Sequence, residues 1–411
     1  SNDGGVYYTN DGAATVSSRN DGYNVGQFYS VAIHPDTGNN YVLGGTQDNG
    51  SWRINNSTTS GPSNGSGVTG GDGGFAHIDQ TNSSLQFTSI YYNTIYRSTD
   101  GGQSFSIWAN HTDTNGNDTG LFINPSTIDS GTKTFYSSID GSSILRIVDY
   151  TTLGTKSVMS ISLGSTASAF KPSPHTDDVL FVGTSSGRMF KIENASTSSY
   201  SVTDITGSNV SGYISSIDIG SSDNQILVTV SNYGATSVFE TYGGGGANGW
   251  SNIEGDLPDM PVRWGLYNRD NFNQVILATD VGTWVSDDIS VSNPTWNPSN
   301  DGIDNVRVDM LAMRSDGAIA AGTHGRGIFY SSAGFSSTAP LNAAFSVDKT
   351  SGVFPLTVQF SDRSTGSPTS WTWDFGDGTT SSQASPSHEY TDSGKYSVSL
   401  TVGDGTNTDV I

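Results

Sequence analysis

Residues 180–191 read LFVGTSSGRMFK and contain the pattern that decides the fold. The run Leu180–Thr184 is almost entirely apolar, which is typical of a strand buried on both faces. Ser and Gly follow it and favour a tight turn. The third part, Arg188–Lys191, begins a further strand. The stretch therefore predicts two consecutive strands joined by a turn, and the same unit returns elsewhere in the chain.

The unit recurs through residues 23–334 with a nearly constant spacing. Each repeat opens with an apolar strand that ends at a polar turn. The last residues of these opening strands are Pro35, Gln80, Pro125, Pro172, Gly220, Arg269 and Ser315. Consecutive positions lie 45 to 49 residues apart. Four-stranded propeller blades repeat at ~40–50 residues. The sequence thus predicts an all-β fold with a seven-bladed β-propeller, or a larger, truncated one.

The seventh repeat stops after its third strand, at Ser331-Ser332. Residues 6–8 and 13–16 could supply the missing outer strand, which would close the ring and remove an open sheet edge. Alternatively, residues 1–20 are the tail of a preceding blade in a longer secreted polypeptide. The sequence leaves both alternatives open.

Composition narrows the class of protein. The 411 residues include 51 Gly and no Cys, and only 14% are charged. The formal net charge of −22 disfavours nucleic acid and anionic membranes as partners. No run of 18 apolar residues predicts a membrane-spanning helix. Without cysteine, thiolate metal sites and cysteine nucleophiles are excluded.

Residues 98–105 read STDGGQSF, in which the Asp carboxylate can accept hydrogen bonds from the turn and the glycines tolerate positive φ. This pattern resembles the Asp-box (BNR repeat) of sialidase-like, sortilin-like and xyloglucan-hydrolysing propellers. Related motifs occur at residues 2–7, 44–52, 70–75, 279–282 and 321–328. As a set they resemble secreted bacterial Asp-box proteins over residues 1–334. In those families the Asp-box itself is structural.

The C-terminal part has a different pattern. Residues 335–344 read as a linker around Pro340. Residues 345–411 resemble a PKD domain, with the WDFGDG motif at 373–378 as the main signal. The resemblance implies an immunoglobulin-like β-sandwich. Trp373 and Phe375 should alternate with polar neighbours on a strand and point into its core.

Three aspartates follow strands that should converge at one face of the propeller: Asp48, Asp72 and Asp280. Paired carboxylates could serve as acid and base in glycoside hydrolysis. The turn Thr279–Gly282 resembles the one that carries a catalytic Asp in the xyloglucan-hydrolysing family, although that family builds its cleft from two propellers. The alternative is that each Asp caps its own turn.

Four further residues are candidates for ligand contact. His324 and Arg326 could bind an acidic sugar or a hydroxyl group, or Arg326 could simply pair with Asp48 or Asp280. Trp52 and Trp284 could stack on a sugar ring, although tryptophans in such repeats also form core.

Asp113, Asn115 and Asn117 resemble the start of a calcium loop, because acidic and amide side chains alternate there. Asn124 stands where the bidentate Glu of such a loop is expected, so a plain hairpin is the alternative. No cofactor is required by any motif, and Ca²⁺ is the one ion the pattern suggests.

Two functions follow from these patterns. The first is a non-catalytic module, secreted or on the surface of a bacterium, that binds a glycan or a cell-surface protein. The second is a glycoside hydrolase of the Asp-box propeller type that uses paired Asp carboxylates on a polysaccharide. The motifs favour the first.

Overall fold

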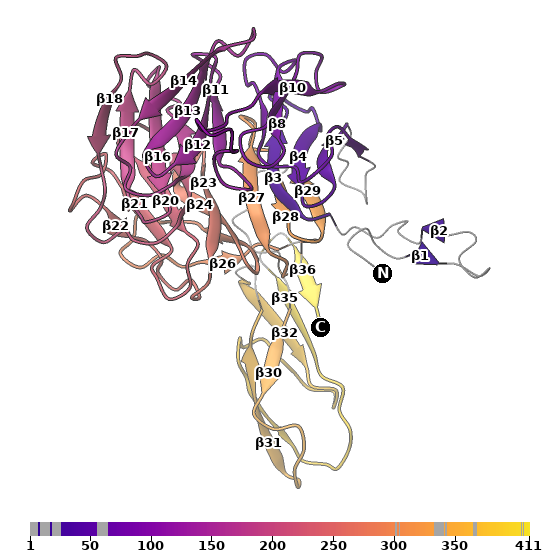
Figure 1. Ribbon diagram of the computed structural model, residues 1–411. Coiled ribbons are helices and arrows are strands. Elements are labelled where there is room, and N and C mark those ends of the chain that lie inside the picture. The colour runs from indigo at the N-terminus through magenta and orange to yellow at the C-terminus, as the bar shows by residue number, and fades with distance from the viewer. Residues whose placement is uncertain are drawn as a thin grey trace. The chain divides into compact units, whose positions relative to one another are not determined.

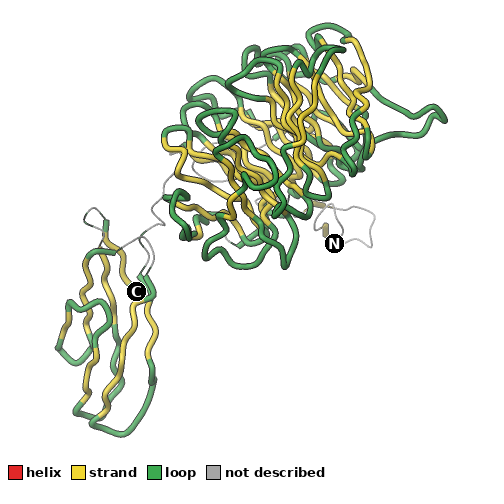
Figure 2. Tube along the Cα trace, turned by 90° about the vertical axis from the view of Figure 1, so that its left-hand side faces the viewer, coloured by secondary structure: helices red, strands yellow, loops and turns green. Residues whose placement is uncertain are grey.

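The computed structural model assigns the chain to the all-β class. It describes residues 7–8, 17–18, 26–55, 65–300, 302–303, 305–332, 341, 343–364, 368–403, 405 and 407–411. Within these ranges every regular element is a strand, and no helix occurs, as Figure 2 shows. Two compact units divide the chain, Ser1–Phe335 and Ser336–Ile411. The predicted all-β class is confirmed for the described residues.

Seven antiparallel sheets form the described body of the first unit, and the strands of each sheet pair in chain order. The first three sheets are β3 (Phe28–Ile33), β4 (Val42–Thr46), β5 (Gly50–Ile54) and β6 (Ser66–Gly67); β7 (Ala76–Ile78), β8 (Gln86–Ser89), β9 (Ile95–Ser98) and β10 (Ser106–Ala109); and β11 (Ser126–Asp129), β12 (Thr134–Asp140), β13 (Ser143–Val148) and β14 (Thr155–Ser160).

The other four sheets continue in the same order. They are β15 (Ala167–Pro172), β16 (Val179–Thr184), β17 (Met189–Glu193) and β18 (Ser201–Asp204); β19 (Ile214–Ile219), β20 (Ile226–Val230), β21 (Val238–Thr241) and β22 (Ser251–Asn252); β23 (Val262–Asn268), β24 (Asn271–Thr279), β25 (Gly282–Ser286) and β26 (Asn297–Pro298); and β27 (Val308–Met313), β28 (Ile319–Thr323) and β29 (Gly327–Ser331). The second strand β16 is buried along its whole length, which confirms the prediction from the apolar run Leu180–Thr184, and β4, β20 and β28 are buried in the same way.

The order in which the sheets pack returns to its start. The first strands β15, β19, β23 and β27 contact one another in succession, and β27 also contacts β3 of the first sheet. Figure 1 shows β27 and β28 (orange) beside β3 and β4 (indigo). The amide nitrogens of Gly325 and Gly327 both donate to the carbonyl of Gly26, at 3.2 and 3.0 Å. Residues about 300 positions apart in sequence are therefore hydrogen-bonded neighbours.

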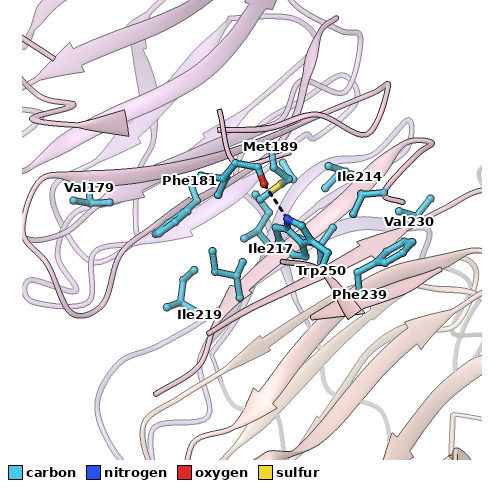
Figure 3. Close-up of a cluster of buried hydrophobic side chains, with 14 residues drawn as sticks. Val179, Phe181, Met189, Ile214, Ile217, Ile219, Val230, Phe239 and Trp250 are labelled. Atoms are coloured by element: carbon cyan, nitrogen blue, oxygen red, sulfur yellow. Dashed lines mark hydrogen bonds between the residues drawn. The ribbon is translucent and has the colours of Figure 1, made fainter. Parts of the chain in front are cut away.

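Apolar side chains fill the space between neighbouring sheets. Figure 3 shows the cluster between the fourth and fifth sheets, where Phe181 and Met189 meet Ile217 and Trp250. The Trp250 indole nitrogen donates to the carbonyl of Ile205 at 2.8 Å, so its one polar atom is satisfied within the core. Burying such side chains is the main favourable term in folding.

One buried carboxylate joins three successive sheets. The Asp218 side chain is fully buried and accepts hydrogen bonds from Lys171 Nζ at 2.9 Å and Arg269 Nη2 at 2.8 Å. Burial would raise the pKa of Asp218, but the two cations outweigh it and the pKa is lowered. A buried charge is tolerated because it is paired in this way.

The predicted closing strand is only partly described. β1 (Tyr7–Tyr8) pairs with β2 (Ser17–Ser18) in a two-stranded sheet, and the seventh sheet has three strands in the described residues. The predicted strand at 13–16 and residue 6 lie outside the described residues, as does most of the predicted linker at 335–344.

The second unit contains two sheets. They are β30 (Phe345–Val347), β31 (Leu356–Asp362) and β34 (Ser387–Tyr390); and β33 (Thr380–Ser381), β32 (Ser370–Asp374), β35 (Ser399–Gly403) and β36 (Thr408–Val410). Trp373 and Phe375 are 0% and 2% exposed, whereas Thr372 and Asp374 between and beside them are exposed. The predicted alternation is confirmed.

Candidate functional site

Eight of the ten predicted site residues lie at one end of the seven sheets. In an antiparallel meander, the turn between the second and third strands lies at the same end as the start of the first strand. We call this end the site face. The second-to-third turns contain Asp48, Asp280, His324 and Arg326. Asp72 lies in the connection that leads to β7, and Asp113, Asn115 and Asn117 lie in the one that leads to β11.

A cavity of about 260 Å³ opens at the centre of the site face. Its lining comes from all seven sheets, and every lining residue except Ser231, which follows β20, lies at or next to the start of a first strand. The lining residues are Tyr29, Phe75, Ile123, Pro125, Ser168, Tyr213, Ser215, Ser231, Arg263, Trp264, Arg307, Asp309 and Met310. Because the first strands enclose one cavity, polar side chains from distant parts of the sequence meet there.

Two arginines and two aspartates dominate the charge of the cavity. Arg263 Nε lies 2.6 Å from Asp280 Oδ1 and 3.9 Å from Asp309 Oδ1. Arg307 Nε donates to Asp309 Oδ1 at 2.8 Å. Tyr233 donates to the other oxygen of Asp280 at 3.4 Å. Both arginines of the lining are thus paired with carboxylates, and each carboxylate is oriented by a fixed partner.

Asp309 also presents an acceptor that no described residue satisfies. Its side chain is 8% exposed, and Asp309 Oδ2 has no hydrogen-bond partner in the described parts of the chain. His324 Nδ1 lies 3.5 Å from this oxygen, within ion-pair distance, and also makes no hydrogen bond among these residues. A buried polar atom without a partner costs free energy. A ligand hydroxyl that donates to Asp309 Oδ2 would remove that cost.

Asp48 and Asp72 form a second acidic pair beside the cavity. The Asp48 amide donates to Asp72 Oδ1 at 2.8 Å, and Asp48 has a left-handed φ of 59°. Asp72 therefore holds the turn that contains Asp48. Burial, followed by the charges of Asp72, Asp48 and Asp309, raises the pKa of Tyr29. Tyr29 thus lies within the electrostatic reach of both acidic groups.

The predicted tryptophans lie away from the cavity. Trp52 is on β5 and Trp284 on β25, both third strands, and neither is among the lining residues. Trp52 Nε1 donates to Asn49 O at 2.8 Å, and Trp284 packs against the core between the fifth and sixth sheets. Arg326 is exposed, and its amide donates to Thr323 Oγ1 at 3.1 Å.

The loop with Asp113, Asn115 and Asn117 is organised by its own hydrogen bonds. Asp113 Oδ1 accepts from the amides of Asn115 and Asn117, each at 2.8 Å, and Oδ2 accepts from Asn117 Nδ2 at 3.0 Å. These bonds describe a tight hairpin. In the described residues no three His, Asp or Glu side chains are placed to hold a metal ion. Calcium binding stays a prediction.

Sequence reasoning missed four central residues of the cavity: Tyr29, Arg263, Arg307 and Asp309. The motifs point to turns after second strands, whereas these residues lie at the starts of first strands. A signal was available, because charged residues at the start of an otherwise apolar strand need a partner. Asp309 lies at an irregularity of β27, where the register shifts between Val308 and Met310, so strand alternation alone does not predict where its side chain points.

Comparison with known proteins bears on the second unit. Residues 338–410 match the PKD domain family. No curated protein matches the chain. Among the described residues, no helix is long and apolar enough to cross a membrane.

Proposed function

We propose that the first unit is a seven-bladed β-propeller of the Asp-box type that binds a neutral glycan at the cavity, in a protein that acts outside the cell. Support for the fold comes from the packing order of the sheets, which returns from β27 to β3. A cavity lined by all seven sheets also supports this fold, because a propeller would leave its central channel where its first strands meet. PKD domains are often extracellular binding modules, which supports the location.

The Asp-box resemblance gains support from the turn between β9 and β10. Asp100 Oδ1 accepts from the amides of Gln103 and Ser104, both at 3.0 Å, and Oδ2 accepts from the Ser104 hydroxyl at 2.6 Å. The Ser104 hydroxyl and amide lower the pKa of Asp100. The aspartate is used entirely in holding the turn, as a structural Asp-box requires.

Charge and size favour a neutral sugar. The two arginines of the lining already have carboxylate partners, and the neighbourhood contains four aspartates. A carboxylate ligand would therefore meet repulsion. A hydroxyl-rich ligand can donate to Asp309 and accept from an arginine at the same time. The cavity of about 260 Å³ is smaller than a typical drug-sized pocket, ~300–1,000 Å³. It suits one sugar residue of a chain.

The single observation that carries this proposal is the unpartnered, buried Oδ2 of Asp309 in a cavity of polar side chains. Calorimetric titration with glucose, galactose, mannose and xylose, and with their β-linked tetramers, tests it. We expect at least one sugar to bind, and Asp309→Asn to weaken its binding by ~10-fold or more.

Asp177→Asn is the matched control. Asp177 is exposed in the turn between β15 and β16, at the opposite end of the sheet from the cavity, so its removal should leave binding unchanged. The proposal is wrong if no sugar binds, or if Asp309→Asn binds as the unaltered protein does.

The glycoside hydrolase is tested in the same samples. Release of reducing ends from the tetramers, abolished by Asp280→Asn, would identify the chain as an enzyme. Binding without release supports the module. The pairing of Asp280 with Arg263 at 2.6 Å favours the module, because this carboxylate oxygen is already engaged by a side chain of the protein.

A further inference from the structure

Three aromatic side chains lie together at the site face: Tyr91 and Tyr92 in the turn between β8 and β9, and Phe122 in the connection to β11. We call them the aromatic platform. The rings of Tyr91 and Phe122 are stacked, with centroids 5.5 Å apart and planes 23° apart. Tyr92 meets Phe122 edge-on at 5.9 Å. Tyr91 is 36% and Phe122 48% exposed, although both are large and apolar enough to be core residues.

The platform is held in place from below. The Tyr92 amide donates to the Phe122 carbonyl at 3.0 Å, which ties the two loops together. Beneath them, Asn124 Nδ2 donates to Asn93 Oδ1 at 2.8 Å, and both amide side chains also donate to Ser138 O. Tyr92 adopts a left-handed φ of 59°, which is unusual for a bulky residue. Exposed rings on loops fixed in this way are pre-organised for contact.

The platform is continuous with the cavity. Ile123, the residue after Phe122, lines the cavity, as does Phe75 at the start of the neighbouring first strand. Gly71 lies against the ring of Tyr91, where a Cβ atom would come within 3.1 Å. The next residue is Asp72, which belongs to the acidic pair beside the cavity. A ligand that extends out of the cavity past Ile123 therefore meets the platform.

We propose that the platform is a second sugar subsite, on which the pyranose next to the one in the cavity stacks. This inference rests on the proposed function. The face of an aromatic ring carries negative potential and attracts the weakly positive C–H groups on one face of a sugar. A protein partner would need ~800 Å² of complementary surface, whereas the platform is a few rings bordered by polar loops. A sugar ring matches that size and chemistry.

The experiment compares short and long ligands. The monosaccharide that binds best and its β-linked tetramer are titrated into the unaltered protein and into Tyr91→Ala, Phe122→Ala and Asp309→Asn. Leu153→Ala is the control, since Leu153 is 83% exposed in the turn between β13 and β14, away from the site face. We expect the platform variants to bind the tetramer ~10-fold more weakly and the monosaccharide unchanged. Asp309→Asn should weaken both.

The outcomes separate the two proposals. If Asp309→Asn weakens binding while both platform variants bind the tetramer normally, the subsite is wrong and the proposed function stands. If the platform variants weaken the monosaccharide and the tetramer equally, the platform belongs to the cavity and a separate subsite is also wrong. If no sugar binds, both proposals fail. We expect each variant to have the same midpoint of thermal unfolding as Leu153→Ala, which excludes misfolding as the cause of weaker binding.

Discussion

At the scale of single residues, ion pairs with Arg263 and Arg307 hold the carboxylates of Asp280 and Asp309 in place at the cavity. Asp280 and His324 follow second strands in the sequence, and both reach the cavity cluster. Asp280 pairs with Arg263, from the start of a neighbouring strand, whereas the pairing of Arg326 with Asp48 or Asp280 stays a prediction. Arg263 and Asp280 belong to the same sheet, in which Val262 pairs with Thr279, so their pairing depends on the register of two strands, which the turn motif alone does not encode.

His77 gives a prediction for the dependence of stability on pH. It lies on β7 between the rings of Phe75 and Phe135, and its Nε2 lies 2.9 Å from Ser126 Oγ of the next sheet. Burial lowers the pKa of His77 from 6.5 to about 4. The unfolded chain therefore takes up a proton before the folded protein does. The contribution of the neutral, buried His77 to the free energy of unfolding is therefore complete above pH 6.5 and is lost as the pH falls toward 4.

We expect the free energy of unfolding to lose on the order of 2 kcal/mol through His77 across that interval. Urea unfolding at pH 7.5 and pH 4.5 measures the loss. In His77→Gln, which keeps a polar atom near Ser126 but does not titrate, the loss should be smaller by that amount. Equal losses in the two proteins would show that the acid sensitivity arises elsewhere.

At the scale of elements, an arginine at one position of three third strands makes the same contact with the next sheet, which the sequence pattern did not predict. Arg53, Arg97 and Arg146 each follow an aromatic or apolar residue on a third strand. Each guanidinium reaches into the next sheet and donates to a carbonyl in its third-to-fourth turn, at 2.9, 2.8 and 3.0 Å. The repeat spacing predicts the strand, but not the crossing to a neighbouring sheet.

Arg146 allows the stability that this contact between sheets provides to be measured. It is 6% exposed, and its Nη1 donates to the carbonyls of Ala195 and Thr197. Arg146→Met keeps the length of the side chain but leaves these acceptors unpaired, so we expect a loss of about 1–3 kcal/mol in the free energy of unfolding. Chemical unfolding followed by tryptophan fluorescence measures it.

The chain supplies a matched control at the same position of the next sheet. Lys191 pairs with Glu193 of its own strand at 3.1 Å, where both side chains are partly exposed. Lys191→Met should cost less than ~1 kcal/mol. If Arg146→Met and Lys191→Met lower the free energy of unfolding equally, the hydrogen bonds of Arg146 to the next sheet contribute no more than an ion pair within one strand.

At the scale of the whole molecule, the repeat length predicted the seven sheets of the first unit, and the WDFGDG motif predicted the fold of the second unit. Seven opening strands in the sequence correspond to β3, β7, β11, β15, β19, β23 and β27. The contact of β27 with β3 spans about 280 residues, and only the requirement that every sheet cover its apolar faces could suggest it. The cavity could not be predicted, because its shape depends on how all seven first strands meet.

The two units have separate cores, and this leads to a prediction about how the chain unfolds. Trp373 is fully buried against Phe345 and Phe360, at ring distances of 5.1 and 5.3 Å, and this cluster lies entirely within the second unit.

Trp373→Ala should lower the free energy of unfolding of that unit by about 3–5 kcal/mol, close to its whole stability. Differential scanning calorimetry should then show one transition lost or lowered by ten degrees or more. The other transition should keep its midpoint, since each unit buries its own apolar side chains. A shift of both transitions by the same amount would mean that the units unfold as one cooperative body, contrary to their separate cores.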